Sequence, residues 1–394
     1  MTGTPALQML WEASDPNEVL ATRFGHPDAD AVARWVANTL KVRWGLVIDS
    51  CERIVMSDHN TLAWITTAAG PMVLKWSIAT SQFPRLEALA ELTGWLTKVG
   101  LPVSKPVVAL DGQRQVELDG VSLSLQRQIE GGLLDTAQPG QVREAGVVLG
   151  RLHDALLEYP GRIPDVAVPT MPLSRQIKDW LDSDLRHLPA AAPDGLRRLL
   201  PEAGPDNLPT QLVHGDYRSA NILVDATGIV AVIDFEEART DHRVVELARS
   251  AVLLGTRFHN WGPVSGDVHA GLLEGYESHR RLTPAEASWW RPLLLWYSLM
   301  MAPLAGDPAG WTESALDQLG AAGFRGSPGQ DPGDLFASPV RLGSDSASTT
   351  VRQAHREGAV TARTAGFACN CAFSSTPPPS RDARDERWIA LDNE

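Results

Sequence analysis

Residues 212–238, LVHGDYRSANILVDATGIVAVIDFEEA, restrict the possible folds of this 394-residue chain more than any other segment. Two short apolar runs, at 222–224 and 229–233, flank a polar turn sequence at 225–228, and this pattern predicts a β-hairpin. A histidine, a glycine and an aspartate precede the first strand, and a second aspartate follows the second strand. Polar groups are therefore expected to collect at one end of the hairpin.

The register of this hairpin decides which polar side chains meet. If Val224 and Ile229 close the loop, Asn221 lies opposite Val232. Asp234 then projects to the same side as Asn221, because residues two apart share one face of a strand. We therefore expect an amide oxygen and a carboxylate to converge at this end of the ribbon.

Asp216 lies in the loop before the first strand and is expected at the same end. A carboxylate and an amide oxygen are hard ligands that suit Mg²⁺, which takes its remaining ligands from water and phosphates. Asn221 and Asp234 are the candidate metal ligands, and Asp216 is the candidate catalytic base for a hydroxyl that attacks phosphorus. The alternative is a hairpin whose Asn and Asp serve only its turns. The joint match of residue types and spacings favours the metal site.

Protein-kinase catalytic centres have the same order of residues: a base Asp, a metal-binding Asn five residues later, and then an Asp-Phe dipeptide. The His-Gly-Asp form at 214–216 resembles the aminoglycoside phosphotransferase and choline kinase-like family, the small-molecule relatives of protein kinases. LGRLHDAL at 149–156 and Glu-Leu-Ala at 246–248 are similar to further segments of that family. Over residues 30–320, the resemblance implies an α+β, two-lobed protein kinase-like fold with ATP bound at the hinge.

The first 130 residues have the pattern of a small, mainly antiparallel sheet. Apolar residues at helical spacing predict a helix at 28–40. Alternation and turn residues predict strands at 52–56, 62–67, 71–76, 116–118 and 121–125. A further helix, opened by Pro84 and ending near Val99, is inserted after the third strand. We interpret residues 1–130 as an N-terminal nucleotide-binding lobe.

Lys75 is one of only five lysines in the chain and lies near the end of an apolar strand. A buried lysine is costly unless it meets an anion, and the phosphates of a nucleotide would supply one. Its alternative role is that of an edge-strand lysine that limits aggregation, but the kinase-like loop favours phosphate binding. Glu87 and Glu91, one turn apart in the following helix, could each pair with Lys75, and we favour Glu87.

The pattern changes from strands to helices near residue 130. Gln128, Ile129 and Glu130 resemble the hinge of the family, whose backbone would hold adenine. Helical periodicity dominates afterwards, and residues 131–325 are interpreted as a C-terminal catalytic and substrate lobe. Residues 326–394 are rich in Ser, Pro, Gly and charge. They cannot bury enough apolar area to offset their ordering entropy and are predicted to form a disordered tail.

Two positions depart from the family pattern. The turn at 56–61 has no glycine, so hydrogen bonds from its backbone amides to phosphates are less expected there. Glu246 stands where the family has an aspartate and is expected to support the catalytic loop. His214 is expected to support the same loop by hydrogen bonding, without acting as an acid or a base.

Charge and hydropathy exclude several classes of protein. With 35 Lys and Arg against 48 Asp and Glu, the net charge is −13, so the chain lacks the basic surface of a nucleic-acid-binding protein. Its first residues lack a signal-peptide pattern, no apolar run is long enough to span a membrane, and three cysteines are too few for a disulfide framework. We expect a cytoplasmic protein without nucleic-acid or membrane partners.

The predicted function is transfer of the γ-phosphate of ATP to a hydroxyl of a small molecule. Acids that follow the second metal ligand favour a cationic acceptor; they are Glu236, Glu237, Asp241, Asp267 and Glu274. The resemblance implies an aminoglycoside or another amino-bearing antibiotic, and hence a role in antibiotic resistance. The alternatives are a metabolic kinase of the homoserine, choline or amino-sugar type and a nucleotide-binding pseudokinase. The complete set of candidate catalytic residues argues against the pseudokinase.

Overall fold

The computed structural model of the chain describes residues 3–10, 12–164, 169, 171–257 and 261–323. Residues 3–319 belong to one of the two units into which the chain divides, and the fold described here is that of this unit. The predicted tail at 326–394 lies outside the described residues.

A mixed six-stranded sheet forms the N-terminal part of this unit, with the strand order β1-β2-β3-β4-β6-β5. Its strands are β1 (Ala6–Met9), β2 (Ile48–Met56), β3 (Asn60–Thr67), β4 (Gly70–Ser77), β5 (Val116–Leu118) and β6 (Val121–Arg127). Neighbouring strands are antiparallel except β1 and β2, which run parallel. The five predicted strands are therefore present. Strand β1 is an addition, and its four residues are too few for an alternating pattern to be recognised.

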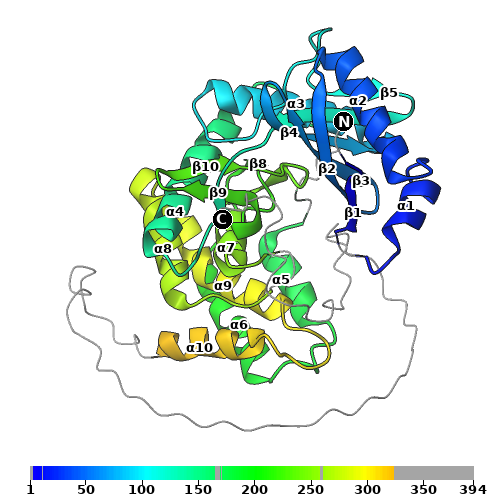
Figure 1. The fold of residues 1–394 in the computed structure, drawn as a ribbon. Helices are drawn as coiled ribbons and strands as arrows, with labels where there is room; N and C mark the ends of the chain where they lie inside the picture. Colours follow the sequence, from blue (N-terminus) through cyan, green and yellow to red (C-terminus); the bar gives the residue numbers. More distant parts are fainter. Residues whose placement is uncertain (1–2, 11, 165–168, 170, 258–260, 324–394) are drawn as a thin grey trace. The chain divides into compact units, whose positions relative to one another are not determined.

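The two faces of this sheet differ because side chains alternate along each strand. Leu74 and Trp76 of β4 are buried in an apolar core, to which α1 (Pro16–Thr22) and α2 (Ala29–Trp44) also contribute buried residues. Figure 1 shows α2 lying against the sheet. Lys75 stands between these two core residues and therefore projects from the opposite face.

Helix α3 (Phe83–Lys98) follows β4 as predicted, after a short 3₁₀ turn at Thr80–Gln82. Its apolar face carries Leu89, Leu92 and Leu96, which are buried in the same cluster as residues of the C-terminal helices. The helix therefore joins the N-terminal sheet to the core of the C-terminal part.

The C-terminal part is mainly helical. Its helices are α4 (Pro139–Glu158), α5 (Leu173–Leu181), α6 (Ala191–Leu199), α7 (Arg243–Leu253), α8 (Gly266–His279), α9 (Pro284–Met300) and α10 (Trp311–Gly323), with 3₁₀ turns at Leu200–Ala203 and Ser219–Asn221. Two small sheets accompany them, one of β7 (Gly132–Leu133), β9 (Ile222–Asp225) and β10 (Gly228–Val232), the other of β8 (Thr210–Val213) and β11 (Arg239–His242). The predicted two-lobed α+β fold is confirmed. Among the described residues, no helix combines the length and apolar character that a membrane span requires.

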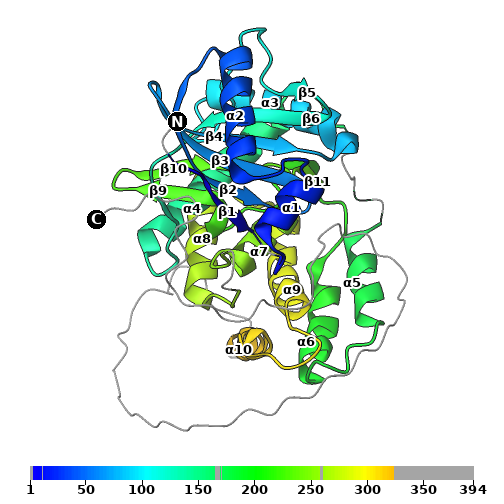
Figure 2. The same cartoon turned by 45° about the vertical axis from the view of Figure 1, so that its right-hand side comes forward.

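Helices α4 and α8 lie side by side, as both views show (Figures 1 and 2). Glycines allow the close approach: a Cβ at Gly146 would lie 2.1 Å from the carbonyl oxygen of Leu272, and one at Gly275 would lie 1.9 Å from that of Arg143. Neither position accepts a side chain without a backbone shift. The two helix backbones are therefore in direct contact.

The hairpin of β9 and β10 is present, but its register differs from the prediction. The loop closes as expected, and a bulge in β10 then shifts the pairing by one residue, so that Val232 lies opposite Ile222 and not Asn221. Asn221 instead accepts a hydrogen bond from the Ile233 amide at 3.0 Å. Because Asp234 follows Ile233 directly, the two polar residues still meet at one end of the hairpin.

Candidate active site

Asp216 and Asn221 are held together in the loop between β8 and β9. The side-chain amide of Asn221 donates to Asp216 Oδ2 and to the Asp216 carbonyl oxygen, both at 2.8 Å. These bonds use the amide nitrogen and leave the amide oxygen for another partner. The spacing of five residues therefore corresponds to a direct contact, which the 3₁₀ turn at Ser219–Asn221 makes possible.

Asp234 lies near this pair, within the electrostatic influence of Asp216 and Lys75. Its φ of 65° is uncommon for a residue other than glycine, and such strained backbone is concentrated at functional sites. Desolvation by the surrounding protein raises the pKa of Asp234, although the neighbouring Lys75 opposes this. The carboxylates of Glu236 and Asp216 raise it further. The negative groups are close enough to repel one another, which favours a bound cation.

The donor set fits Mg²⁺ bound together with a nucleotide. Within the part of the chain that the structure describes, no three His, Cys, Asp or Glu side chains form a metal site by themselves. One carboxylate and one amide oxygen are present instead, from Asp234 and Asn221. Mg²⁺ commonly takes only one or two protein ligands and completes its shell with phosphate and water oxygens. These two residues could therefore hold it.

Two arginines that no local motif marks flank Asp216. Arg218 Nε donates to Asp216 Oδ2 at 2.9 Å, and Arg249 Nη2 lies 3.7 Å from Oδ1. Burial alone would raise the pKa of Asp216, but the two guanidinium groups hold it below its usual value. Asp216 is therefore an anion at neutral pH and can orient a hydroxyl group by accepting its hydrogen bond.

The loop that carries Asp216 is supported by two buried residues, His214 and Glu246. His214 Nδ1 accepts from the Asp216 amide at 3.1 Å, so its Nε2 carries the proton and donates to the Ile233 carbonyl oxygen at 3.0 Å. Glu246 accepts hydrogen bonds from the backbone amides of His214 and Gly215. The predicted supporting roles of His214 and Glu246 are confirmed.

Glu246 is itself part of a buried network. His153 of α4 contacts Glu246 Oε2 through Nε2 at 2.7 Å and the Tyr276 hydroxyl of α8 through Nδ1 at 2.8 Å. Burial alone would raise the pKa of Glu246, but the hydrogen bonds from His153 and from the Gly215 amide lower it to about 2. The packing of α4 on α8 is therefore connected to the loop that carries Asp216.

Gly215 meets two requirements that only glycine satisfies. Its φ of 87° is left-handed, and a Cβ would lie 2.1 Å from the carbonyl oxygen of Glu237. The loop therefore passes directly against the segment that follows Asp234. This close approach explains why a glycine stands between His214 and Asp216.

Lys75 contacts Glu236 and not the predicted Glu87. The Lys75 Nζ forms an ion pair with Glu236 Oε1. Glu87 is exposed on α3, and Glu91 lies 3.5 Å from Arg114. The expected pairing of Lys75 with Glu87 is therefore wrong, because α3 turns both of these glutamates toward solvent.

The surroundings of Lys75 suit an anion-binding amine. Burial lowers its pKa, but the carboxylates of Glu236 and Asp234 raise it to about 12, so the amine stays cationic. The side chain remains 28% exposed. Lys75 can therefore also reach a ligand that enters the site.

The predicted hinge follows the end of β6. The Gln128 amide donates to the Pro71 carbonyl oxygen at 3.1 Å, which extends the pairing of β6 with β4 by one residue. This N–H is engaged within the protein and cannot also bind a base. The Gln128 carbonyl group and the backbone of Ile129 and Glu130 stay the candidates for adenine, since β7 begins at Gly132 and pairs with β9.

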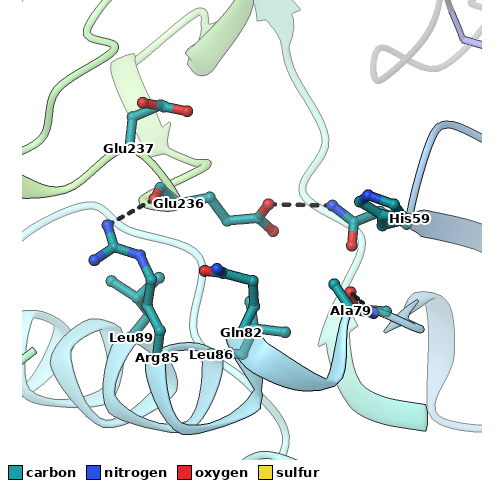
Figure 3. A pocket seen from close by; sticks show the side chains of 10 residues that line it. His59, Ala79, Gln82, Arg85, Leu86, Leu89, Glu236 and Glu237 are labelled. Atoms are coloured by element: carbon teal, nitrogen blue, oxygen red, sulfur yellow. Dashed lines mark hydrogen bonds between the residues drawn. The ribbon is translucent and has the colours of Figure 1, made fainter. Parts of the chain in front are cut away.

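A cavity of about 180 Å³ lies next to Glu236 (Figure 3). The turn between β2 and β3, the start of α3 and the segment after Asp234 line it. Asn60 Nδ2 donates to Glu236 Oε2 at 3.2 Å, and Arg85 of α3 donates to the Glu236 carbonyl oxygen at 2.8 Å. Glu236 therefore links all three walls of this cavity.

Most of the acids expected to attract a cationic acceptor are paired. The pairs are Glu236–Lys75, Asp241–Arg239 at 3.1 Å and Glu274–Arg143 at 2.9 Å. Glu237 lines the cavity, and partial burial together with the nearby Asp216 raises its pKa. The charge around Asp216 is therefore more nearly balanced than the count of acids in the sequence implies.

A two-lobed fold in which an Asp–Asn pair and a second Asp meet a strand lysine defines a phosphotransferase of the protein-kinase type. The chain matches the model of the phosphotransferase enzyme family (APH) over residues 53–290 and belongs to that family. It is a small-molecule phosphotransferase with an alcohol group as acceptor.

Individual proteins are similar to this chain in sequence or in fold. The homoserine kinase of Caulobacter sp. (strain K31) is 28% identical over 242 residues, which cover 58% of this chain and 71% of that protein. The homoserine kinase of Caulobacter vibrioides is 30% identical over 195 residues, covering 49% of this chain and 61% of its own. The crystal structure of a macrolide 2′-phosphotransferase from Brachybacterium faecium superposes with a TM-score of 0.51 at 18% identity, over 76% of this chain and 99% of that one. This last similarity concerns the fold.

Proposed function

We propose that this protein transfers the γ-phosphate of ATP to a hydroxyl group of a small molecule in the cytoplasm, with Mg²⁺ as the metal cofactor. The observation that carries the proposal is the contact between Asp216 and Asn221 beside Asp234, within the electrostatic reach of Lys75. The residues proposed as base, as metal ligands and as phosphate-binding amine are therefore close enough to act together.

Each residue has a separate role in the proposed reaction. Asp216 accepts the hydrogen bond of the acceptor hydroxyl and then its proton. The new oxygen–phosphorus bond forms while the bond between the γ-phosphorus and the ADP oxygen breaks. Lys75 binds phosphate oxygens, and the hinge backbone lies against adenine. Mg²⁺ held by Asn221 and Asp234 would neutralise charge on the phosphates.

For the acceptor, we place a small alcohol that carries a carboxylate first, with homoserine as the leading candidate. Arg218 and Arg249 put two positive charges beside Asp216, where the acceptor hydroxyl must lie. Guanidinium groups bind carboxylates with good geometry. The homoserine kinases among the relatives support the same class of acceptor.

An amino-bearing acceptor such as an aminoglycoside is the second candidate. The observation that favours it is Glu237, which lines the cavity near Asp216 and could attract an amine. The choice between the two candidates depends on whether the arginines or this glutamate face the bound acceptor.

The test is ADP release by the purified protein with ATP and Mg²⁺, measured against homoserine, choline, amino sugars, aminoglycosides and neutral sugars. Turnover with homoserine supports the first candidate, and turnover with aminoglycosides alone supports the second. Removal of Mg²⁺ with a chelator should abolish either activity. Turnover confined to neutral sugars would contradict both candidates. Nucleotide binding without transfer to any acceptor would support the pseudokinase alternative.

A further inference from the structure

The partner of Lys75 comes from the loop after Asp234 and not from helix α3. The two oxygens of Glu236 have different partners: Oε1 pairs with Lys75 Nζ, and Oε2 accepts from Asn60 Nδ2 at 3.2 Å. Asn60 begins β3 and lies within the turn at 56–61 that has no glycine. One carboxylate therefore sets the positions of the strand lysine and of this turn at the same time.

Helix α3 contributes a cation to this arrangement. Arg85 donates to the carbonyl oxygens of Glu236 at 2.8 Å and Ala238 at 2.5 Å, and also to that of Pro164 at 3.3 Å. Figure 3 shows the Arg85 guanidinium at the backbone of Glu236, while the Glu236 carboxylate extends away from it, toward the turn that carries His59. The backbone of Glu236 is thus held from the helix, and its side chain reaches across to the sheet.

We propose that Glu236 is the residue that positions Lys75 for the phosphates of the nucleotide, and that Arg85 holds Glu236 in place for this purpose. In the expected arrangement, a glutamate of helix α3 would pair with Lys75. In the structure, the helix instead supplies a cation, Arg85, and the loop after Asp234 supplies the carboxylate of Glu236 that pairs with Lys75. The inference rests on the proposed function, because it concerns the same nucleotide site.

The physical reason lies in the flexibility of lysine. Its amine sits on a four-carbon stem with many rotamers, and an anion at a fixed distance restricts them. The exposed carboxylates of Glu87 and Glu91 cannot do this, since neither lies at Lys75 in the structure. A partner attached two residues after Asp234 also places the lysine relative to the candidate metal ligand.

The test compares Glu236→Gln with Glu87→Gln, and uses Glu117→Gln, on the exposed side of β5, as the matched control. We expect Glu236→Gln to raise both the Kd and the KM for ATP about tenfold, a change within reach of one charged contact. The KM for the acceptor should stay unchanged, which a general loss of structure would not allow. Glu87→Gln should resemble the control.

A double-mutant cycle with Lys75→Met gives the sharper result. Glu236→Gln should add almost nothing in the Lys75→Met background, because its effect acts through the lysine. Arg85→Gln should produce a smaller loss of ATP affinity in the same direction. Direct measurement of ATP affinity needs no acceptor, so it remains informative if the acceptor is unknown.

Several outcomes would overturn the inference. Additive effects of the Lys75 and Glu236 substitutions, or an equal loss with Glu87→Gln, would remove Glu236 from this role. If excess Mg²⁺ restored the ATP affinity of the Glu236→Gln variant, Glu236 would be a metal ligand instead. A wild-type protein that binds no ATP would refute the proposed function itself. A wild type that binds ATP, together with a Glu236→Gln variant of unchanged affinity, would refute this inference alone.

Discussion

At the scale of a single residue, two opposing effects determine the pKa of Asp216. Burial disfavours its charge, while Arg218 and Arg249 stabilise it. The net result is a carboxylate that stays ionised at neutral pH and can accept a hydrogen bond from a hydroxyl group. Its position, and not a raised pKa, therefore qualifies it as the candidate base.

Replacing Asp216 by Asn keeps the shape of the side chain and removes its charge. We expect kcat to fall by about 10²- to 10⁴-fold, the range typical of a lost acid–base group, with little change in ATP affinity. Steady-state ADP release and calorimetric ATP binding measure the two quantities. Asp234→Asn is the comparison, since it should weaken ATP binding in the presence of Mg²⁺. Wild-type turnover in Asp216→Asn would disprove the assignment of the base.

The ionisation of one buried residue, Glu246, contributes to the stability of the fold. Its pKa is lowered to about 2 in the folded protein, so its contribution is fully present above the ordinary Glu pKa of about 4.5 and disappears as pH falls toward about 2. A shift of this size corresponds to about 3 kcal/mol of unfolding free energy. The measurement is urea unfolding of wild type and Glu246→Gln at neutral and acidic pH. The variant should be less stable at pH 7, and the difference should shrink below pH 4.5; a constant difference would contradict the prediction.

At the scale of elements, the contact between α4 and α8 depends on glycine. A Cβ at Gly275 would meet the Arg143 carbonyl oxygen at 1.9 Å, so one helix backbone must move. This movement would disturb the bond between His153 and Tyr276, which spans the same two helices. The packing of two helices is therefore linked to the support of the catalytic loop.

We expect Gly275→Ala to destabilise the protein by about 2–3 kcal/mol, because overpacking outweighs the better helix propensity of alanine. Gly140→Ala, also in a helix, is the control, since a Cβ there meets nothing within 4 Å. It should leave stability unchanged or raise it slightly. Denaturant unfolding of both variants measures the difference. Equal stability of the two variants would show that α4 and α8 can separate at no cost.

At the scale of the whole described fold, α3 and the contacts of Glu236 link the N-terminal sheet to the C-terminal part. The leucines of α3 are buried with the C-terminal helices, while Arg85 and Lys75 meet the loop after Asp234 from the helix and from the sheet. The candidate site lies where these contacts converge. Its geometry therefore depends on how the sheet and the helical part pack together.

Residues 327–394 are expected to contribute little to this packing, because their composition offers few apolar groups to bury. Deleting them should change Tm by less than about 2 °C, which corresponds to less than about 1 kcal/mol, and should leave ADP release unchanged. Differential scanning fluorimetry and the activity assay test this. A large loss of Tm would show that part of this segment packs against the rest of the protein.

The sequence by itself determined the features whose partners are close along the chain. The hairpin, the Asp216–Asn221 pair and the supporting roles of His214 and Glu246 follow from short-range spacing and from motif resemblance. Strand alternation and turn residues also predicted the strand that carries Lys75. These features are local, so turn chemistry and periodicity constrain them strongly.

Only the tertiary structure decided the partner of Lys75, the arginines beside Asp216 and the register at the open end of the hairpin. Asn60 and Glu236, which meet in the same cluster as Lys75, are 176 positions apart. Several glutamates and arginines have the right chemistry, and sequence cannot rank them, because a salt bridge depends on distance and burial. Both quantities are set by how the sheet and the helices pack against one another.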